Sequence, residues 1–267
     1  MNKLLVVAAF ASLLGFASSY GADLKESNPA PVAGRQILMK AELPARVGNP
    51  RDGSDALDST KTENVDFWLF LPSDESAKNE AGFPLMLFLH GAGERGSDPN
   101  VVKFHGPAKL CDVPEIAKNW KFLTVSPQCK ANTTWSPLQM SVLIDELCAS
   151  YPIDKSRVYV TGLSMGGFAT WGVASVASDK VAAIAPICGW YSADAASTIK
   201  APVWAFHGEA DPAVACRAGR EIVEAVRMNG NKDVSFTTYP GVQHDSWTQT
   251  YDNPELYDWF LSKSLKK

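Results

Sequence analysis

Short apolar stretches alternate with longer polar or mixed segments along most of the chain. Apolar runs bounded by Gly, Pro or polar residues predict strands, and longer segments with helical spacing predict helices. Strands are expected at 64–71, 84–89, 121–126, 158–161, 181–186, 202–206 and 234–239. Helices are expected at 138–150, 166–178, 218–229 and 254–264. This alternation predicts an α/β protein with a mainly parallel central sheet and helices on both faces.

The first 21 residues have the pattern of a secretory signal peptide. Lys3 is followed by an apolar run over 4–17 and then by small residues. Cleavage is expected after Gly21, with Ser19 as the alternative site. A membrane anchor is the competing interpretation, but the run is shorter than the roughly 20 residues that a membrane span needs. We therefore expect a secreted or periplasmic protein.

The rest of the chain is predicted to form one domain preceded by a short region. Residues 23–34 are rich in Pro, Ala, Gly and Ser, which predicts a flexible lead-in, and 48–60 is polar and predicts a loop. We assign 22–63 to an N-terminal lead-in and first strand region, and 64–267 to the α/β domain. No internal repeat or interdomain linker is visible in the sequence.

The composition excludes several classes of protein. The 267 residues are 46% hydrophobic, with 25 Lys+Arg against 29 Asp+Glu and a formal charge of −4. These values exclude a disordered chain. Because no strongly basic stretch is present, we expect neither nucleic acid nor a membrane as a partner. The mean hydropathy of −0.10 argues against a polytopic membrane protein.

The cysteines suggest at most a minor role for disulfides. There are five, so at least one has no intramolecular partner. No C-x-x-C pair occurs, which argues against a zinc or redox site. Spacing does not fix the pairing, but Cys188 and Cys216 should both follow neighbouring strands, so this is the pair we favour. The others are Cys111, Cys129 and Cys148.

A candidate nucleophile lies in the motif Gly162-Leu163-Ser164-Met165-Gly166. The motif matches G-x-S-x-G directly after a predicted strand and before a predicted helix. A serine on such a tight turn exposes its hydroxyl, and the two glycines remove side chains where the backbone is crowded. The N-terminal dipole of the following helix favours negative charge that develops at the serine.

A candidate acid and base follow later in the chain. Asp211 lies in a loop directly after the predicted strand 202–206, with Glu209 as the competitor. His244 lies between the last predicted strand and the last predicted helix, and it is the only one of four histidines that follows both Ser164 and Asp211. His207 precedes the acid and is expected to brace its loop. The order Ser, Asp, His is that of the α/β-hydrolase fold.

The stretch His90-Gly91-Ala92-Gly93 after the predicted strand 84–89 is a candidate oxyanion loop. We expect the backbone N–H of Ala92, or alternatively of Gly93, to bind the oxyanion together with that of Met165. His90 is expected to brace this loop, and Glu94 and Arg95 to order it. The stretch does not match a phosphate-binding motif.

These motifs together resemble a known family. The segments LHGAGERG, SPQC, YPIDKSRVYVTGLSMGGFATW, APVWAFHGEADP and YPGVQHDSWTQTYDNPELYDWFL look like those of secreted α/β-hydrolase esterases labelled predicted peptidases. These esterases are similar to polyhydroxybutyrate depolymerases and to feruloyl and acetylxylan esterases, and more distantly to prolyl oligopeptidases. The resemblance implies that residues 64–267 form an α/β-hydrolase catalytic domain. It also implies that Ser164, Asp211 and His244 act as nucleophile, acid and base.

The resemblance implies a serine carboxylesterase that needs no cofactor and no metal. Its substrate would be a small-molecule or polysaccharide-linked ester with a short-chain, acetyl or phenolic acyl group. Trp135, Trp190 and Trp247 lie on loops near the predicted triad and either line an aromatic cleft or only pack locally. Because no long insertion predicts a lid, we expect an open cleft.

Two other functions compete with the esterase hypothesis. One is a serine peptidase of the prolyl-oligopeptidase type, although no propeller-sized domain is present. The other is a noncatalytic carbohydrate-binding protein on a hydrolase scaffold, although all three triad residues remain. A dienelactone hydrolase would require Cys as the nucleophile, where this chain has Ser164. The sequence does not predict the oligomeric state.

Overall fold

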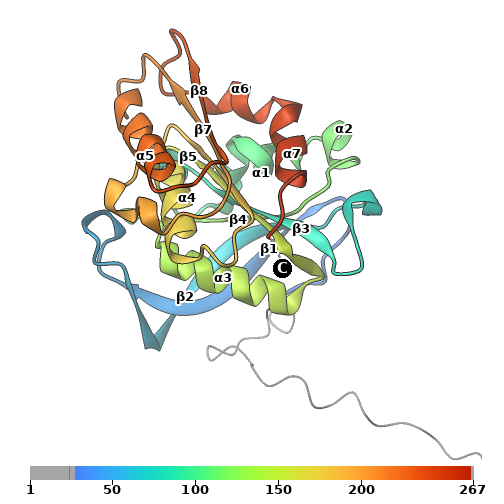
Figure 1. Ribbon diagram of the computed structural model, residues 1–267. Coiled ribbons are helices and arrows are strands. Elements are labelled where there is room, and N and C mark those ends of the chain that lie inside the picture. Colours follow the sequence, from blue (N-terminus) through green and yellow to red (C-terminus); the bar gives the residue numbers. More distant parts are fainter. Residues whose placement is uncertain (1–23, 25–27, 266–267) are drawn as a thin grey trace, which may run out of the picture.

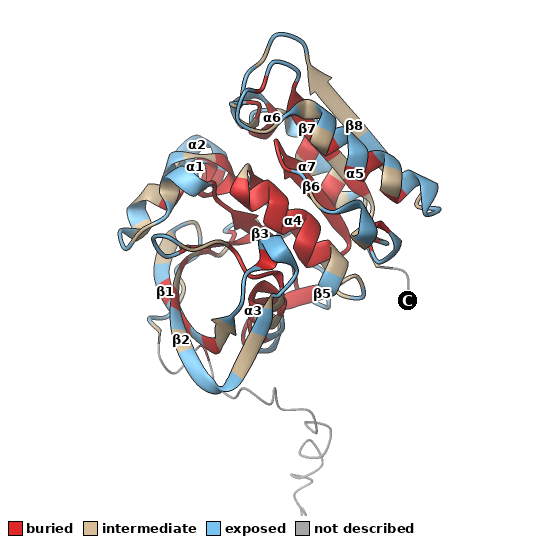
Figure 2. Cartoon of the chain, turned by 90° about the vertical axis from the view of Figure 1, so that its left-hand side faces the viewer, coloured by how far each residue is buried: buried red, intermediate tan, exposed pale blue. Residues whose placement is uncertain are grey.

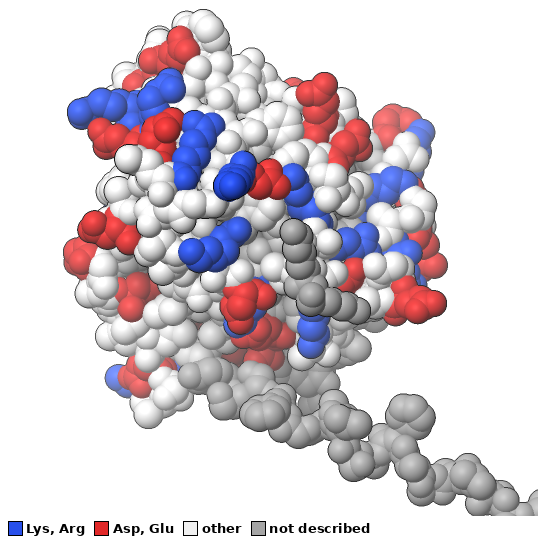
Figure 3. All heavy atoms as spheres, viewed as in Figure 1, with Lys and Arg blue, Asp and Glu red and all other residues white. Residues whose placement is uncertain are grey.

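The structure is a computed structural model that describes Leu24 and residues 28–265 (Figure 1). The predicted signal peptide, 1–21, lies outside the described residues. Among the described residues, none of the helices has the length and apolar character that a membrane crossing requires. Acidic and basic side chains are interspersed over the face drawn in Figure 3.

One sheet of eight strands runs through the molecule in the order β1-β2-β4-β3-β5-β6-β7-β8. The strand pairs β1–β2 and β2–β4 are antiparallel, and every other neighbouring pair is parallel. The strands are β1 (Gln36–Val47), β2 (Ala56–Phe70), β3 (Phe83–Leu89), β4 (Leu123–Pro127), β5 (Ile153–Leu163), β6 (Ala183–Ile187), β7 (Val203–Gly208) and β8 (Val234–Tyr239). The predicted mainly parallel sheet is therefore present.

In the described part of the chain, seven α-helices and five short 3-10 helices connect the strands. The α-helices are α1 (Gly106–Leu110), α2 (Pro114–Ala117), α3 (Pro137–Ser150), α4 (Met165–Val176), α5 (Cys216–Met228), α6 (Trp247–Tyr251) and α7 (Pro254–Leu261). The 3-10 helices are η1 (Pro50–Asp52), η2 (Glu75–Ala77), η3 (Ala92–Glu94), η4 (Pro99–Phe104) and η5 (Ala193–Ser197). The four longest α-helices are the four predicted from helical spacing.

The helices cover both faces of the sheet, and each face has its own apolar core. On one face α3, α4 and α5 pack on the strands through residues such as Leu143, Trp171 and Val223. On the other face α1, α2, α6 and α7 do so, with Leu256 and Phe260 fully buried. Figure 2 shows α4 buried along most of its length. A strand covered on both sides has a continuous run of apolar residues, which is why β3 could be predicted from the sequence.

The N-terminal strands differ from the sequence-based expectation. The predicted loop 48–60 is a turn only as far as residue 55, because β2 begins at Ala56 and pairs with β1. The first half of β2 is polar and mostly exposed, so no apolar alternation marks it as a strand. The expected boundary between residues 63 and 64 falls inside β2, and β1 and β2 belong to the same sheet as the rest.

The favoured disulfide is absent from the structure. Cys188 and Cys216 are both free thiols, as are the other three cysteines. Cys188 is fully buried at the end of β6, whereas Cys216 begins α5 and is half-buried. The two cysteines do follow neighbouring strands, but this placement does not bring their sulfur atoms into a bond.

Candidate active site

The turn between β5 and α4 presents the hydroxyl of Ser164. The residue has φ 52° and ψ −112°, a backbone conformation that is strained for any side chain with a Cβ. A serine before a helix commonly caps it with its side chain, but the Ser164 hydroxyl makes no capping bond to α4. Its backbone N–H donates to the Ile187 carbonyl at 2.9 Å, which ties the turn to the end of β6. The hydroxyl is therefore held out of the helix and available to other groups.

Gly162 and Gly166 permit the tight packing of this turn. A Cβ on Gly166 would collide with the Leu89 carbonyl, and one on Gly162 would lie 2.6 Å from that same carbonyl oxygen. The two positions are thus closed to any other residue without a backbone shift. The spacing of the motif follows from this contact between the turn and the end of β3.

Asp211 lies in the loop after β7, where its side chain is fully buried. One carboxylate oxygen, Oδ1, accepts the backbone N–H groups of Ala213 at 2.8 Å and Val214 at 2.9 Å. Burial alone would raise the pKa of Asp211, but the hydrogen bonds from His244 and from these two amides outweigh it and lower the pKa. The carboxylate is therefore charged and fixed in orientation.

His244 joins the serine to the acid. Its Nδ1 lies 2.7 Å from Oδ2 of Asp211, and its Nε2 lies 3.0 Å from Oγ of Ser164. The Nδ1–H can donate to the carboxylate while Nε2 accepts the serine hydroxyl proton, which is the arrangement required of a general base. The structure thus brings together the three residues that sequence order singled out. Glu209 instead accepts from the Thr238 hydroxyl at 2.7 Å and is exposed.

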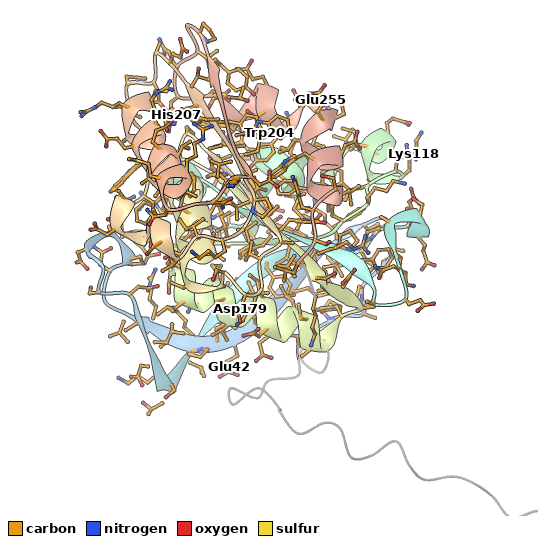
Figure 4. The ribbon with its side chains drawn as sticks, viewed as in Figure 1. Glu42, Lys118, Asp179, Trp204, His207 and Glu255 are labelled. Atoms are coloured by element: carbon orange, nitrogen blue, oxygen red, sulfur yellow. The ribbon has the colours of Figure 1, made fainter. Side chains whose placement is uncertain are left out.

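His207 braces the acid loop, as its place before Asp211 suggested. Its Nε2 lies 2.9 Å from the Val214 carbonyl and 3.3 Å from Oδ2 of Asp211. Burial lowers the pKa of His207, against the raising effect of the carbonyl and the carboxylate. A neutral ring donates one hydrogen bond from Nε2, and the Val214 carbonyl is the nearer acceptor. Figure 4 shows His207 beside α5 in the upper part of the molecule.

Two backbone N–H groups near Ser164 lack an intrahelical acceptor because of their positions. Met165 is the first residue of α4, and Ala92 is the first residue of η3. The two segments are in contact, since a Cβ on Gly91 would lie 2.7 Å from the Leu163 side chain and 3.6 Å from the Leu163 carbonyl. Ala92 and Met165 thus belong to two contacting segments at the serine turn, while Gly93 lies further into η3.

The fully buried His90 holds the Ala92 loop through three hydrogen bonds. Its Nδ1 donates to the Gly91 carbonyl at 2.7 Å, and its Nε2 accepts the Cys129 backbone N–H at 3.0 Å. Burial lowers the pKa of His90 to about 4, against the raising effect of the bond to Gly91. The Trp135 indole N–H donates to the His90 carbonyl at 3.0 Å. A neutral His90 satisfies both ring contacts at once.

The three tryptophans occupy different settings. Trp135 is 3% exposed and packs edge to face on His90, which favours the packing interpretation over a place in an open cleft. Trp190 is 39% exposed and lies against Phe168, with ring centroids 5.1 Å apart. Trp247 stands edge to face against the His244 ring at 5.3 Å. Trp247 therefore presents an aromatic ring beside His244, and Trp190 presents one against Phe168 of α4.

Trp247 also contacts a residue that sequence reasoning did not select. The His105 ring lies 5.5 Å from the Trp247 ring, and its Nε2 is 3.7 Å from a Glu94 carboxylate oxygen. The Trp247 indole nitrogen and the second Glu94 oxygen are buried, and neither has a hydrogen-bond partner among the residues that the structure describes. No motif surrounds His105 in the sequence. Its position directly after η4 brings its ring against Trp247.

Cys188, Asp211 and His244 have ligand atoms within 4.8 Å of one another. His, Cys and Asp are residue types that bind Zn²⁺. However, Nδ1 of His244 and Oδ2 of Asp211 already face each other at 2.7 Å, so a metal ion between them would replace that hydrogen bond. The pair is better suited to holding a proton than to holding a cation.

The fold and this constellation define a class, the α/β hydrolases with a serine at the strand–helix turn. The dienelactone hydrolase family model matches residues 131–257, a stretch that includes Ser164, Asp211 and His244. The solved structure of a thermostable esterase is similar to the chain at a TM-score of 0.69 and 30% identity, covering 84% of this chain and 63% of that one. The predicted α/β-hydrolase fold is therefore confirmed.

Similar curated proteins include esterases of the expected group. The bifunctional acetylxylan esterase/xylanase XynS20E of Neocallimastix patriciarum is 31% identical over 153 residues, which are 53% of this chain and 20% of that protein. Poly(3-hydroxyalkanoate) depolymerase C of Paucimonas lemoignei is 32% identical over 130 residues, which are 39% of this chain and 31% of that protein. The chain matches less than a third of either relative. The resemblance to this esterase group is confirmed, and the similarity to hydrolases supports the expected carboxylesterase.

Proposed function

We propose that this protein is a serine carboxylesterase in which Ser164, His244 and Asp211 form the catalytic triad. The observation that carries the proposal is the continuous hydrogen-bonded chain from the serine hydroxyl through the imidazole to a buried carboxylate. Similar esterases and the α/β-hydrolase fold support it.

The proposed reaction has two acyl-transfer steps. His244 takes the proton of Ser164 as Oγ attacks the ester carbonyl, and the bond from carbon to Oγ forms. Negative charge on the carbonyl oxygen is stabilised by the N–H groups of Ala92 and Met165. His244 then gives its proton to the leaving alcohol, and in the second step it activates the water that releases the acid. Asp211 holds the ring and stabilises the imidazolium throughout.

The proposed substrates are short-chain, acetyl or phenolic esters, including those linked to carbohydrate. The half-exposed ring of Trp190 and the ring of Trp247 offer flat apolar surfaces that suit sugar or phenolic rings. Between β6 and β7 the chain forms only the short helix η5, which leaves no segment there long enough for a lid. An acetylxylan esterase among the similar proteins points to the same substrates. The N-terminal sequence pattern supports export, which we include in the proposal.

The proposal is tested by hydrolysis of 4-nitrophenyl acetate, butyrate and laurate with the wild type and with Ser164→Ala. We expect turnover of the two short esters and a loss of about 10⁴-fold or more in the variant. A fluorophosphonate probe should label the wild type at Ser164 and leave the variant unlabelled. Equal activity of the two proteins would assign the nucleophile elsewhere. Faster cleavage of a peptide amide than of the esters would favour a peptidase.

A further inference from the structure

Three arginines surround one hollow beside the Ala92 loop. Arg46 near the end of β1, Arg51 in η1 and Arg95 directly after η3 line a hollow of about 320 Å³. Its other lining residues belong to the turn 48–50 and to the loop 132–134. This arginine hollow thus collects positive charge from segments that are far apart in the sequence.

Adjacent backbone carbonyls hold two of these guanidinium groups side by side. Nη1 of Arg95 donates to the Thr133 carbonyl at 3.0 Å, and Nη1 of Arg46 donates to the next carbonyl, that of Thr134. Nε of Arg95 also donates to the Ala92 carbonyl at 2.9 Å. The arginines are therefore placed by bonds to the backbone and retain further N–H groups for a ligand.

No carboxylate of the described residues forms an ion pair with Arg46, Arg51 or Arg95. The nearby Glu63 carboxylate is engaged by Lys130 at 2.9 Å and by Gln139. Asp55 acts on Arg46 only at longer range, and its Oδ2 accepts the Leu138 N–H at 3.2 Å.

Elsewhere the basic side chains are commonly paired, for example Lys180 with Asp145 and Lys263 with Asp233. Like charges held close together repel one another, so the three unpaired arginines favour the binding of an anion.

The hollow adjoins the proposed site of ester cleavage. Nε of Arg95 donates to the carbonyl of Ala92, the residue whose N–H is the proposed oxyanion donor. A single substrate could therefore place its ester at Ser164 and a neighbouring group in the hollow.

We infer that the arginine hollow binds a carboxylate or sulfate group on the carbohydrate whose ester is cleaved at Ser164. The inference rests on the proposed esterase function and narrows its substrate to acyl esters of acidic glycans. Guanidinium groups present planar pairs of donors that match the oxygens of either anion. The chemistry is shared by a uronic acid and a sulfated sugar, and the test separates them.

The first test measures binding without turnover, by calorimetry on Ser164→Ala. Three ligands are compared: acetylated xylotriose, the same trisaccharide with a glucuronosyl branch, and the same trisaccharide with a sulfate group. We expect at least one acidic ligand to bind about fivefold or more tightly than the neutral one, and added salt to reduce the difference. The tighter of the two acidic ligands identifies the anion. Equal dissociation constants for all three would overturn the inference.

The second test removes the positive charge. Arg51→Gln and the combined Arg51→Gln, Arg95→Gln variant are prepared on the Ser164→Ala background. The acidic-to-neutral affinity ratio should fall toward one, further in the double variant. Arg51 is exposed in its turn, so its substitution keeps the test valid if the double variant does not fold. Lys118→Gln removes an exposed charge directly after α2, labelled at the right of Figure 4, and should retain the ratio.

Kinetics with the serine restored separate this inference from the esterase proposal. If the arginine variants lower kcat/KM for the acidic ester more than for the neutral one, mainly through KM, both ideas are supported. If the ratio of kcat/KM values is the same as in the wild type, the arginine hollow does not select substrate, although the esterase proposal stands. If the wild type hydrolyses none of the esters but the Ser164→Ala protein still binds the acidic ligand selectively, the esterase proposal alone is refuted.

Discussion

The indole N–H of Trp135 donates a 3.0 Å hydrogen bond to the backbone carbonyl of His90, and the two rings meet edge to face at 4.8 Å. The bond joins the loop after β4 to the start of the loop that carries Ala92. Trp135 therefore helps to hold the loop of the proposed oxyanion hole, although its own side chain is buried.

Replacement of this tryptophan should weaken both the fold and the reaction. Trp135→Phe keeps an aromatic ring but removes the donor, which leaves a buried carbonyl unpaired at a cost of about 1–3 kcal/mol. We expect a lower free energy of unfolding in urea and a lower kcat for 4-nitrophenyl acetate, with little change in KM. Trp68→Phe is the matched control, because it also removes an indole donor to a backbone carbonyl, that of Pro99 at 2.7 Å. If Trp135→Phe changes stability but not kcat, the bond does not position the Ala92 loop.

Substitution of the acid should test the proton arrangement at His244. In Asp211→Asn, Oδ1 can still accept the two loop amides, which directs the amide nitrogen at Nδ1 of His244. The ring would then carry its proton on Nε2 and could not accept one from Ser164, so kcat should fall about 10⁴-fold. Glu209→Gln alters the competing carboxylate and should leave the rate close to that of the wild type. The reverse result would assign the acid to Glu209.

The buried His90 should make stability depend on pH. Its pKa is lowered from 6.5 to about 4 in the folded protein, so below pH 6.5 the unfolded chain binds a proton that the folded chain does not. The contribution of His90 to the free energy of unfolding should thus be at its maximum above pH 6.5. It should fall by about 3 kcal/mol as the pH approaches 4.

Urea unfolding over this pH range measures the effect. His90→Asn should have a flatter profile, because an amide can donate and accept without titrating. Some dependence should remain, since burial also lowers the pKa of His207. His105→Asn controls for the loss of a histidine at the surface of the site. An unchanged slope in His90→Asn would show that His90 is not the titrating group.

Free cysteines predict that reduction has no effect on stability. Alkylation of the denatured protein without reductant should modify all five thiols, as measured by intact mass, and dithiothreitol should leave the Tm unchanged. Modification of only three thiols, with a fall in Tm on reduction, would show that a disulfide forms. Peptide mapping would then tell whether it joins Cys188 to Cys216.

The site was visible in the sequence because its residues follow strands. Parallel strands end at one edge of a sheet, so the loops after β3, β5 and β7 had to meet there. Ser164 and Asp211 could therefore be placed from the apolar runs that precede them, and His244 from its order in the chain. The length of β2 could not be predicted in this way, because its polar first half is held by pairing with β1 and not by burial.

Contacts between side chains from distant elements could likewise not be predicted from the sequence. The expected Cys188–Cys216 bridge relied on neighbouring strands, but sulfur separation depends on where each loop turns. His105 comes to the site through the path of η4, which no motif marks. The arginine hollow depends on two successive carbonyls, those of Thr133 and Thr134, and no spacing between Arg46 and Arg95 indicates that they share this anchor.

The hairpin of β1 and β2 carries two of the three arginines of the hollow and none of the residues of the proposed triad. Arg46 and Arg51 belong to this hairpin, which lies before the matched family region 131–257, whereas Ser164, Asp211 and His244 all lie within it. Codons for the hairpin can thus change, or be exchanged between homologues, while those for bond cleavage stay fixed. Under the proposed role of the arginine hollow, hairpin grafts should change the preference for acidic over neutral esters.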